Sequence, residues 1–193
     1  MSARERILDR VKAAVERRDR LEHPGNFEGW RPAAPSGDAV DQLTSMLEAA
    51  GAEVVREDGL AGAGKWVRRF ANDFESVTVG VTLPAQLRPM TTTRGSHEAE
   101  LGVSMARGAV AETGSLIMDA RDGRRTQLLT PTHVVFVRAT DIHVTFRDAL
   151  LSLRDDLPSA IGLHSGPSKS ADIAQTLVKG VHGPGRLIAV LIT

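Results

Sequence analysis

One segment of the chain combines small residues, hydroxyls and a positive charge in an order that suits the binding of an anion. It follows an expected strand and runs Ser165-Gly166-Pro167-Ser168-Lys169-Ser170-Ala171-Asp172-Ile173. Ser168 or Ser170 is expected to cap a helix that starts near Ser170, with the free N–H groups of its first turn facing the loop. Lys169 would add a positive charge where a phosphate or carboxylate could bind. Alternatively, the serines only cap this helix and Asp172 only complements its dipole.

A second segment, residues 108–117, places one carboxylate at a tight turn between two apolar stretches. Glu112 stands there among small residues and is followed by Thr113, Gly114 and Ser115. A carboxylate shielded from water at such a turn could act as an acid, a base or a nucleophile. Alternatively, Glu112 accepts backbone hydrogen bonds that fix the turn, and the neighbouring hydroxyls do similar local work. The sequence leaves both interpretations open.

A third segment, residues 180–185, precedes the last expected strand and is rich in glycine. Its glycines allow the backbone to approach a ligand closely, which makes His182 and Gly183 candidate ligand-binding residues. A plain turn between two strands explains the segment almost as well.

The composition removes several classes of function. The 193 residues contain no cysteine, which excludes a disulfide framework, a thiolate zinc site, a cysteine nucleophile and a cysteine-held iron–sulfur cluster. Lys and Arg (24) balance Asp and Glu (24), so the composition provides no broad positive surface for nucleic acid. Apolar runs are shorter than a signal peptide or the roughly 20 residues of a membrane helix. We therefore expect a cytoplasmic protein without membrane insertion.

Two familiar ligand-binding spacings are incomplete. The stretch Gly59-Leu60-Ala61-Gly62-Ala63-Gly64-Lys65 has the glycine and lysine spacing of a phosphate-binding P-loop, but Trp66 stands where a hydroxyl must bind magnesium. We interpret the stretch as a flexible turn before a helix. The six histidines lack the i, i+2 or i, i+4 pairing of a preformed metal site, so no metal site is predicted. The alternative is a metal site assembled by the fold from four side chains: Glu112, His164, Asp172 and His182.

Alternating helix and strand patterns predict an α/β protein. Residues 1–22 are expected to form an N-terminal helix that extends as an arm, because a connection rich in Pro and Gly follows it. Residues 38–193 are expected to form a single α/β domain. Helices are expected over 3–20, 38–51, around Trp66 and over 146–153, and strands over 53–55, 77–81, 108–112, 115–118, 133–137, 160–163 and 187–192.

Four blocks together resemble the lactate-utilisation protein C family, also called the LUD domain family. They cover residues 108–117, Pro131-Thr132-His133-Val134-Val135-Phe136, residues 165–173 and residues 180–192, in the order found in that family. The resemblance implies a Rossmann-like layered sheet with helices on both faces, similar to the ribose-phosphate isomerase, glucosamine-phosphate deaminase and coenzyme A transferase superfamily. It also implies Glu112 as a candidate catalytic residue and a ligand-binding surface made of Thr113, Gly114, Ser115, Ser165, Gly166, Pro167, Ser168, Lys169, Ser170, Asp172, His182 and Gly183.

The resemblance further implies a role in the oxidation of L-lactate to pyruvate, beside partner subunits that carry iron–sulfur clusters. The lack of cysteine fits an arrangement in which the partner subunits carry out the redox chemistry. This chain would then be a non-redox component that binds a small anion or scaffolds its partners. One alternative is a stand-alone enzyme for a phosphosugar or an acyl-coenzyme A thioester, with Glu112 as nucleophile by analogy with the glutamate of coenzyme A transferases. Another is a sensor of small anions without turnover.

Overall fold

The chain forms two compact units, which are described separately. A computed structural model describes residues 2–17, 37–90, 95, 97–170 and 178–193, and the units divide after residue 34. The first contains α1 (Ala3–Glu16), which starts with a capping box: the Ser2 hydroxyl accepts from the Glu5 N–H, and the Glu5 carboxylate accepts from the Ser2 N–H. None of the residues of α1 is buried. The end of the predicted arm, residues 18–22, lies outside the described residues.

The second unit is built on a five-stranded sheet whose strands are all parallel. The strand order is β1-β11-β6-β3-β2. The strands are β1 (Glu53–Glu57), β2 (Val77–Val79), β3 (Leu101–Met105), β6 (Thr132–Arg138) and β11 (Arg186–Ile192). The two central strands, β11 and β6, are buried along almost their whole length, as expected for a parallel sheet that is covered on both faces.

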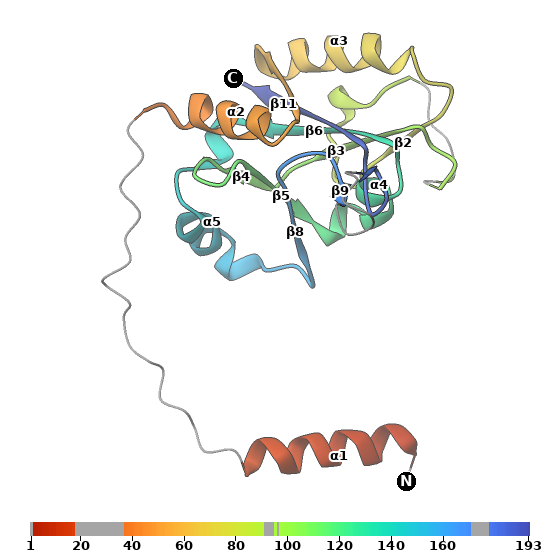
Figure 1. Ribbon diagram of the computed structural model, residues 1–193, viewed down its shortest axis with the longest axis vertical. Coiled ribbons are helices and arrows are strands. Elements are labelled where there is room, and N and C mark those ends of the chain that lie inside the picture. The colour runs from red at the N-terminus through yellow and green to blue at the C-terminus, as the bar shows by residue number, and fades with distance from the viewer. Residues whose placement is uncertain (1, 18–36, 91–94, 96, 171–177) are drawn as a thin grey trace. The chain divides into compact units, whose positions relative to one another are not determined.

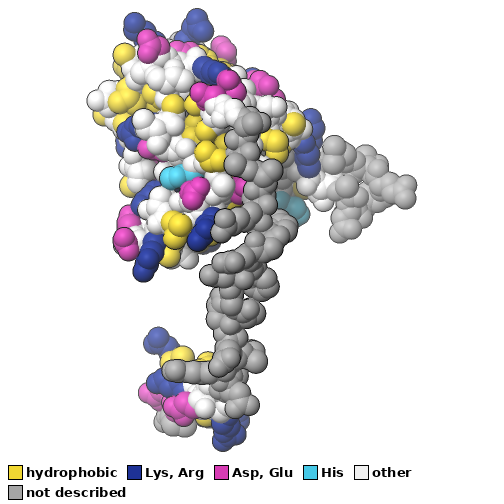
Figure 2. Space-filling view, turned by 90° about the vertical axis from the view of Figure 1, so that its left-hand side faces the viewer, with side chains coloured by type: hydrophobic (Ala, Val, Ile, Leu, Met, Phe, Trp, Pro, Cys, Tyr) yellow, Lys and Arg dark blue, Asp and Glu magenta, His cyan; other side chains and the backbone are white. Residues whose placement is uncertain are grey.

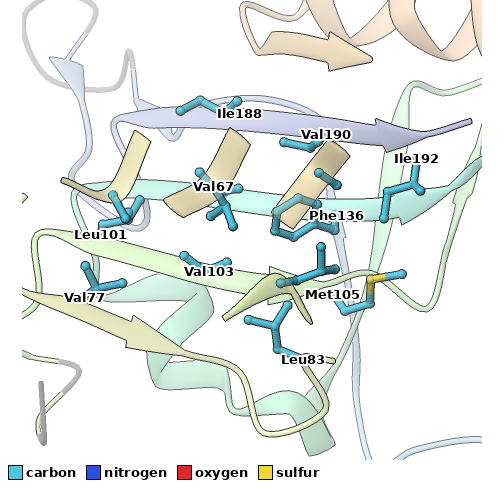
Figure 3. Packing of buried hydrophobic residues seen from close by; sticks show 14 residues of the cluster. Val67, Val77, Leu83, Leu101, Val103, Met105, Phe136, Ile188, Val190 and Ile192 are labelled. Carbon is cyan, nitrogen blue, oxygen red and sulfur yellow. The ribbon is translucent and has the colours of Figure 1, made fainter. Parts of the chain in front are cut away.

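One face of the sheet packs against α3 (Gly59–Ala71). Val67 of α3 and Phe136 of β6 lie in one apolar cluster, with alternate residues of the neighbouring strands around them (Figure 3). Burial of this apolar surface stabilises the fold, at about 25 cal/mol per Å² removed from water. The glycine-rich stretch that starts at Gly59 is therefore part of the helix itself, and our prediction of a turn before the helix was wrong there.

The other face is covered by α2 (Ala39–Ala49) and by a second sheet of order β7-β4-β5-β8 (Figure 1). Its strands are β4 (Gly108–Val110), β5 (Ser115–Asp119), β7 (Ile142–His143) and β8 (Ile161–His164). The helix α5 (Phe146–Leu153) packs on the outer side of this second sheet. The second unit therefore has helices on both faces of its parallel sheet, and the predicted Rossmann-like α/β class is confirmed.

The remaining elements are short. They are η1 (Ala85–Leu87), η2 (Ala120–Asp122), α4 (Arg124–Leu128), η3 (Ala139–Asp141), η4 (Arg154–Asp156), β9 (Lys169–Ser170) and β10 (Val178–Lys179). The strands β9 and β10 pair in antiparallel fashion. Because Lys169 and Ser170 form a strand, Ser168 does not cap a helix, and that part of the expectation was wrong. The rest of the helix expected from Ser170 onward lies outside the described residues.

The surface carries both charge signs. On the face shown in Figure 2, Lys and Arg side chains are interspersed with Asp and Glu side chains. Among the described residues, no helix is long and apolar enough to cross a membrane.

Candidate functional site

The turn between β4 and β5 meets the loop after β8 through a cluster of hydroxyls. The Ser115 and Ser165 Oγ atoms lie 2.9 Å apart, and the Thr113 hydroxyl donates to Ser115 Oγ at 2.9 Å. Ser115 is buried, while Ser165 is partly buried. Two segments that are 50 residues apart in the sequence are thus held together by their hydroxyls.

Glu112 is turned toward α5 and satisfies a backbone group at the start of that helix. Its Oε1 accepts a hydrogen bond from the Phe146 N–H at 2.6 Å. The Thr145 hydroxyl caps the same helix by accepting from the Asp148 N–H. This geometry favours the interpretation in which Glu112 fixes local structure, and its catalytic role stays a prediction.

Replacing Glu112 separates these two roles. We expect Glu112→Ala to lower the free energy of unfolding by about 1–2 kcal/mol, because the Phe146 N–H loses its acceptor. Glu112→Gln keeps a carbonyl oxygen in place, so its loss should be less than half as large. Urea denaturation of the three proteins measures this difference, and equal losses in both variants would contradict the structural role.

A second pair of loops meets at Ser168. The Ser168 N–H donates to the Pro184 carbonyl at 2.8 Å, and the Ser168 carbonyl accepts from the Gly180 N–H at 3.0 Å. The Ser168 hydroxyl accepts from the His182 N–H at 3.3 Å. Three bonds from one residue thus fix the loop that carries His182.

The loop with His182 forms one wall of an open groove of about 680 Å³. The opposite wall is the segment that leads from α4 into β6. The lining residues are Leu128, Leu129, Thr130, Pro131, Lys179, Gly180, Val181, His182, Gly183 and Gly185. Both walls directly precede strands of the parallel sheet, namely β6 and β11. The groove therefore lies at the amino-terminal edge of the sheet, whereas ligands of open α/β sheets usually bind at the carboxyl edge.

The two lysines of the β9–β10 hairpin have different surroundings. Lys169 Nζ donates to the Ala50 carbonyl at 2.5 Å, at the carboxyl end of α2, where a cation is favoured by the helix dipole. Lys179 pairs directly opposite Lys169 in the hairpin and lines the groove. We had expected Lys169 to supply the charge for an anion, but in the structure the lysine of the groove is Lys179.

A pair of histidines lies between the two sheets. His133 is fully buried, its Nε2 is 3.0 Å from Ser104 Oγ, and its Nδ1 has no hydrogen-bond partner among the described residues. Its ring meets the edge of His164, with centroids 6.0 Å apart. Burial, and secondarily the neighbouring His164, lower the pKa of His133 to about 3, and burial also lowers the pKa of His164. Both rings are therefore neutral near pH 7.

The structure brings together some of the predicted site residues and leaves others apart. Ser168 contacts the loop in which His182 and Gly183 line the groove, while Thr113, Ser115 and Ser165 form the separate hydroxyl cluster. Asp172 lies outside the described residues. Within the part of the chain that is described, no group of three or more His, Asp or Glu side chains could hold a metal ion. Two further residues, Lys179 and His133, were missed by sequence reasoning, because only the fold shows their surroundings. His164 was named only in the alternative of a metal site assembled by the fold.

These features define a class of protein, an α/β protein whose loops gather at the amino-terminal edge of a parallel sheet. The LUD domain model matches residues 88–192, more than half of the sequence, and the chain belongs to the LUD domain family. The fold is also that of a DUF162 family protein from Deinococcus radiodurans, whose crystal structure has a TM-score of 0.61 and 19% sequence identity. That match covers 80% of this chain and 96% of the other.

Two relatives extend the comparison. Lactate utilization protein C of Macrococcus caseolyticus is 25% identical over 170 residues, which cover 80% of this chain and 71% of that protein. An uncharacterized protein of Neisseria meningitidis serogroup B is 28% identical, and the match covers 100% of this chain and 94% of that protein. Several further relatives named Lactate utilization protein C match over less than two thirds of their own length.

Proposed function

We propose that this chain is a non-redox component of an L-lactate utilisation system that oxidises lactate to pyruvate. Relatives named Lactate utilization protein C support the pathway. The sequence has no cysteine to bind an iron–sulfur cluster through thiolates, so the electron carriers belong to partner subunits. The contribution of this chain is to bind a small anion and to assemble with those partners.

Anion binding is supported mainly by one observation: Ser168 contacts the loop that carries His182, and this loop lines the groove together with Lys179. Like charges directly opposite each other in a hairpin are unfavourable, and Lys169 and Lys179 occupy such positions. Only Lys169 has a hydrogen-bond partner within the described ranges. An anion beside Lys179 would offset this repulsion.

The groove residues supply two kinds of contact to a carboxylate or phosphate. Lys179, which lines the groove, provides a positive charge. The glycines beside His182 let the backbone approach the ligand closely. Leu129 and Val181, which are about half exposed, offer apolar surface to the rest of the molecule.

Reconstitution with the iron–sulfur partner subunits tests this proposal. We expect this chain to form a complex with the partners in size-exclusion chromatography and to increase lactate-dependent reduction of an electron acceptor. Replacing two polar side chains of the groove, in Lys179→Gln/His182→Ala, should reduce that rate at least about tenfold, since a hydrogen bond to a charged group such as Lys179 contributes about 1.5–3 kcal/mol.

Lys65→Gln is the matched control, because Lys65 is an exposed lysine of α3 and does not line the groove. Its rate should equal that of the unmodified chain. If the partners showed neither a complex nor a change in rate, the proposed function would be wrong. A full rate with the double variant would contradict anion binding in the groove.

A further inference from the structure

A second, smaller pocket lies beside β8 and has a volume of about 150 Å³. Its lining residues are Ala120, Arg124, Gln127, Leu128, Ala160, Ile161, Gly162 and His164. The volume equals about five water molecules at their share of liquid volume, so it suits an acid of about six non-hydrogen atoms. A nucleotide or a coenzyme A thioester is far too large for it.

Two polar side chains of this pocket are without hydrogen-bond partners. Arg124 is exposed and makes no hydrogen bond or ion pair with any described residue. His164 is only partly exposed, and no described residue bonds its ring nitrogens. A neutral imidazole carries one N–H donor and one acceptor nitrogen. The pocket thus offers a guanidinium and an imidazole that can each bind an oxygen.

Hydrogen bonds and an ion pair hold the walls of the pocket in place. The Ala120 N–H donates to the Ala160 carbonyl at 3.1 Å, and the Gln127 amide donates to the Asp119 carbonyl at 2.9 Å. An ion pair of 2.8 Å joins Arg121 to Asp156. Hydrogen bonds from Arg121 and Arg107 lower the pKa of Asp156 to about 2 and keep this pair ionised near neutral pH. A preformed pocket loses little conformational entropy when it binds.

We propose that this pocket binds a small 2-hydroxy or 2-oxo monocarboxylate, with the carboxylate on Arg124 and the oxygen of the second carbon on His164. The planar guanidinium fits a carboxylate through two parallel hydrogen bonds. The imidazole accepts from a hydroxyl or donates to a keto oxygen, so it serves both oxidation states of such an acid. The choice of acid rests on the proposed function, but the pocket and its two side chains do not.

Titration of the full chain with L-lactate, pyruvate and propionate, followed by NMR, tests the inference. Arg124→Gln should weaken binding of L-lactate at least about tenfold, because it removes the charged partner of the carboxylate. Arg125→Gln is the matched control, since Arg125 is the next residue, is also exposed and does not line the pocket. Its affinity should stay within about twofold of the unmodified chain.

The role of His164 has its own readout. Propionate lacks the second oxygen, so His164→Phe should weaken L-lactate and pyruvate but leave the affinity for propionate unchanged. The inference would be overturned if no acid bound, or if Arg125→Gln lost as much affinity as Arg124→Gln. It would also be contradicted if L-lactate binding were abolished by Lys179→Gln/His182→Ala and not by Arg124→Gln. These binding results can be told apart from a failure of the proposed function, because that function is tested by complex formation and reaction rate with the partner subunits.

Discussion

Replacing Gly114 with alanine will destabilise the protein by about 2–5 kcal/mol, a large part of the stability of a domain of this size. Gly114 has a φ of +62°, in the left-handed region, which costs other residues about 1–2 kcal/mol. A Cβ at this position would also lie 2.6 Å from Met46 Cβ and 3.0 Å from the Met46 carbonyl carbon. Overpacking of this kind costs about 1–3 kcal/mol more.

Gly59 provides a control that separates the two effects. Its φ is +58°, close to that of Gly114, but an added Cβ would meet no atom within 4 Å. Gly59→Ala should therefore cost only the backbone part, about 1–2 kcal/mol. Denaturation in urea gives both values, and equal costs for the two variants would show that the contact with α2 is unimportant.

Acid should destabilise the protein well before its carboxylates become protonated. The pKa of His133 is about 3 in the folded protein and near the ordinary value of about 6.5 in the unfolded chain. Below pH 6.5 the unfolded state therefore binds a proton that the folded state does not, and the free energy of unfolding falls with pH. At pH 4.5 the loss from His133 alone is about 3 kcal/mol.

Urea denaturation between pH 7 and pH 4.5 isolates this effect. The lowered pKa values of Asp119, Asp156 and Glu53 lie below this window, so those groups lose stability only in stronger acid. His164 contributes in the same direction as His133. Replacing both hydrogen-bonded partners, in His133→Leu/Ser104→Ala, should remove most of the pH dependence, since no buried polar group is left unpaired. An unchanged slope would contradict the assignment.

Elements with a strong local signal were predictable from the sequence. The apolar run from His133 to Val137 indicated a strand buried on both faces, and β6 has that position. The helix over 146–153 has the predicted bounds because Thr145 supplies its cap. The hairpin of β4 and β5 was also expected from its apolar stretches and small residues.

The strand β3 was missed in the sequence analysis, although all five of its residues are buried. Leu101, Val103 and Met105 face α3, but Gly102 and Ser104 face the other side of the sheet. An added Cβ on Gly102 would lie 2.6 Å from the Thr126 carbonyl oxygen, and Ser104 bonds His133. The apolar residues of this strand alternate with small and polar ones, but only the tertiary neighbours of Gly102 and Ser104 explain why those two positions are buried as well.

The sequence indicated which loops form the candidate site, but it did not indicate which side chains contact each other there. The sequence indicated the segments that contain Ser168 and His182, and they do meet. Which lysine lines the groove depends on the register of the β9–β10 hairpin and on the position of α2. His164 and His133 come from different sheets, so only their packing brings the two rings together.

The position of β11 has a consequence for how the chain acquires its structure. The strand lies between β1 and β6, and Arg186 forms an ion pair with Glu53, 133 residues earlier in the sequence. The central sheet therefore stays in two pieces until residues 186–192 have left the ribosome. Pairing over such a long separation slows folding, and until then the edges of β1 and β6 are open to other chains. We therefore expect the chain to be most prone to aggregation before β11 has paired with β1 and β6.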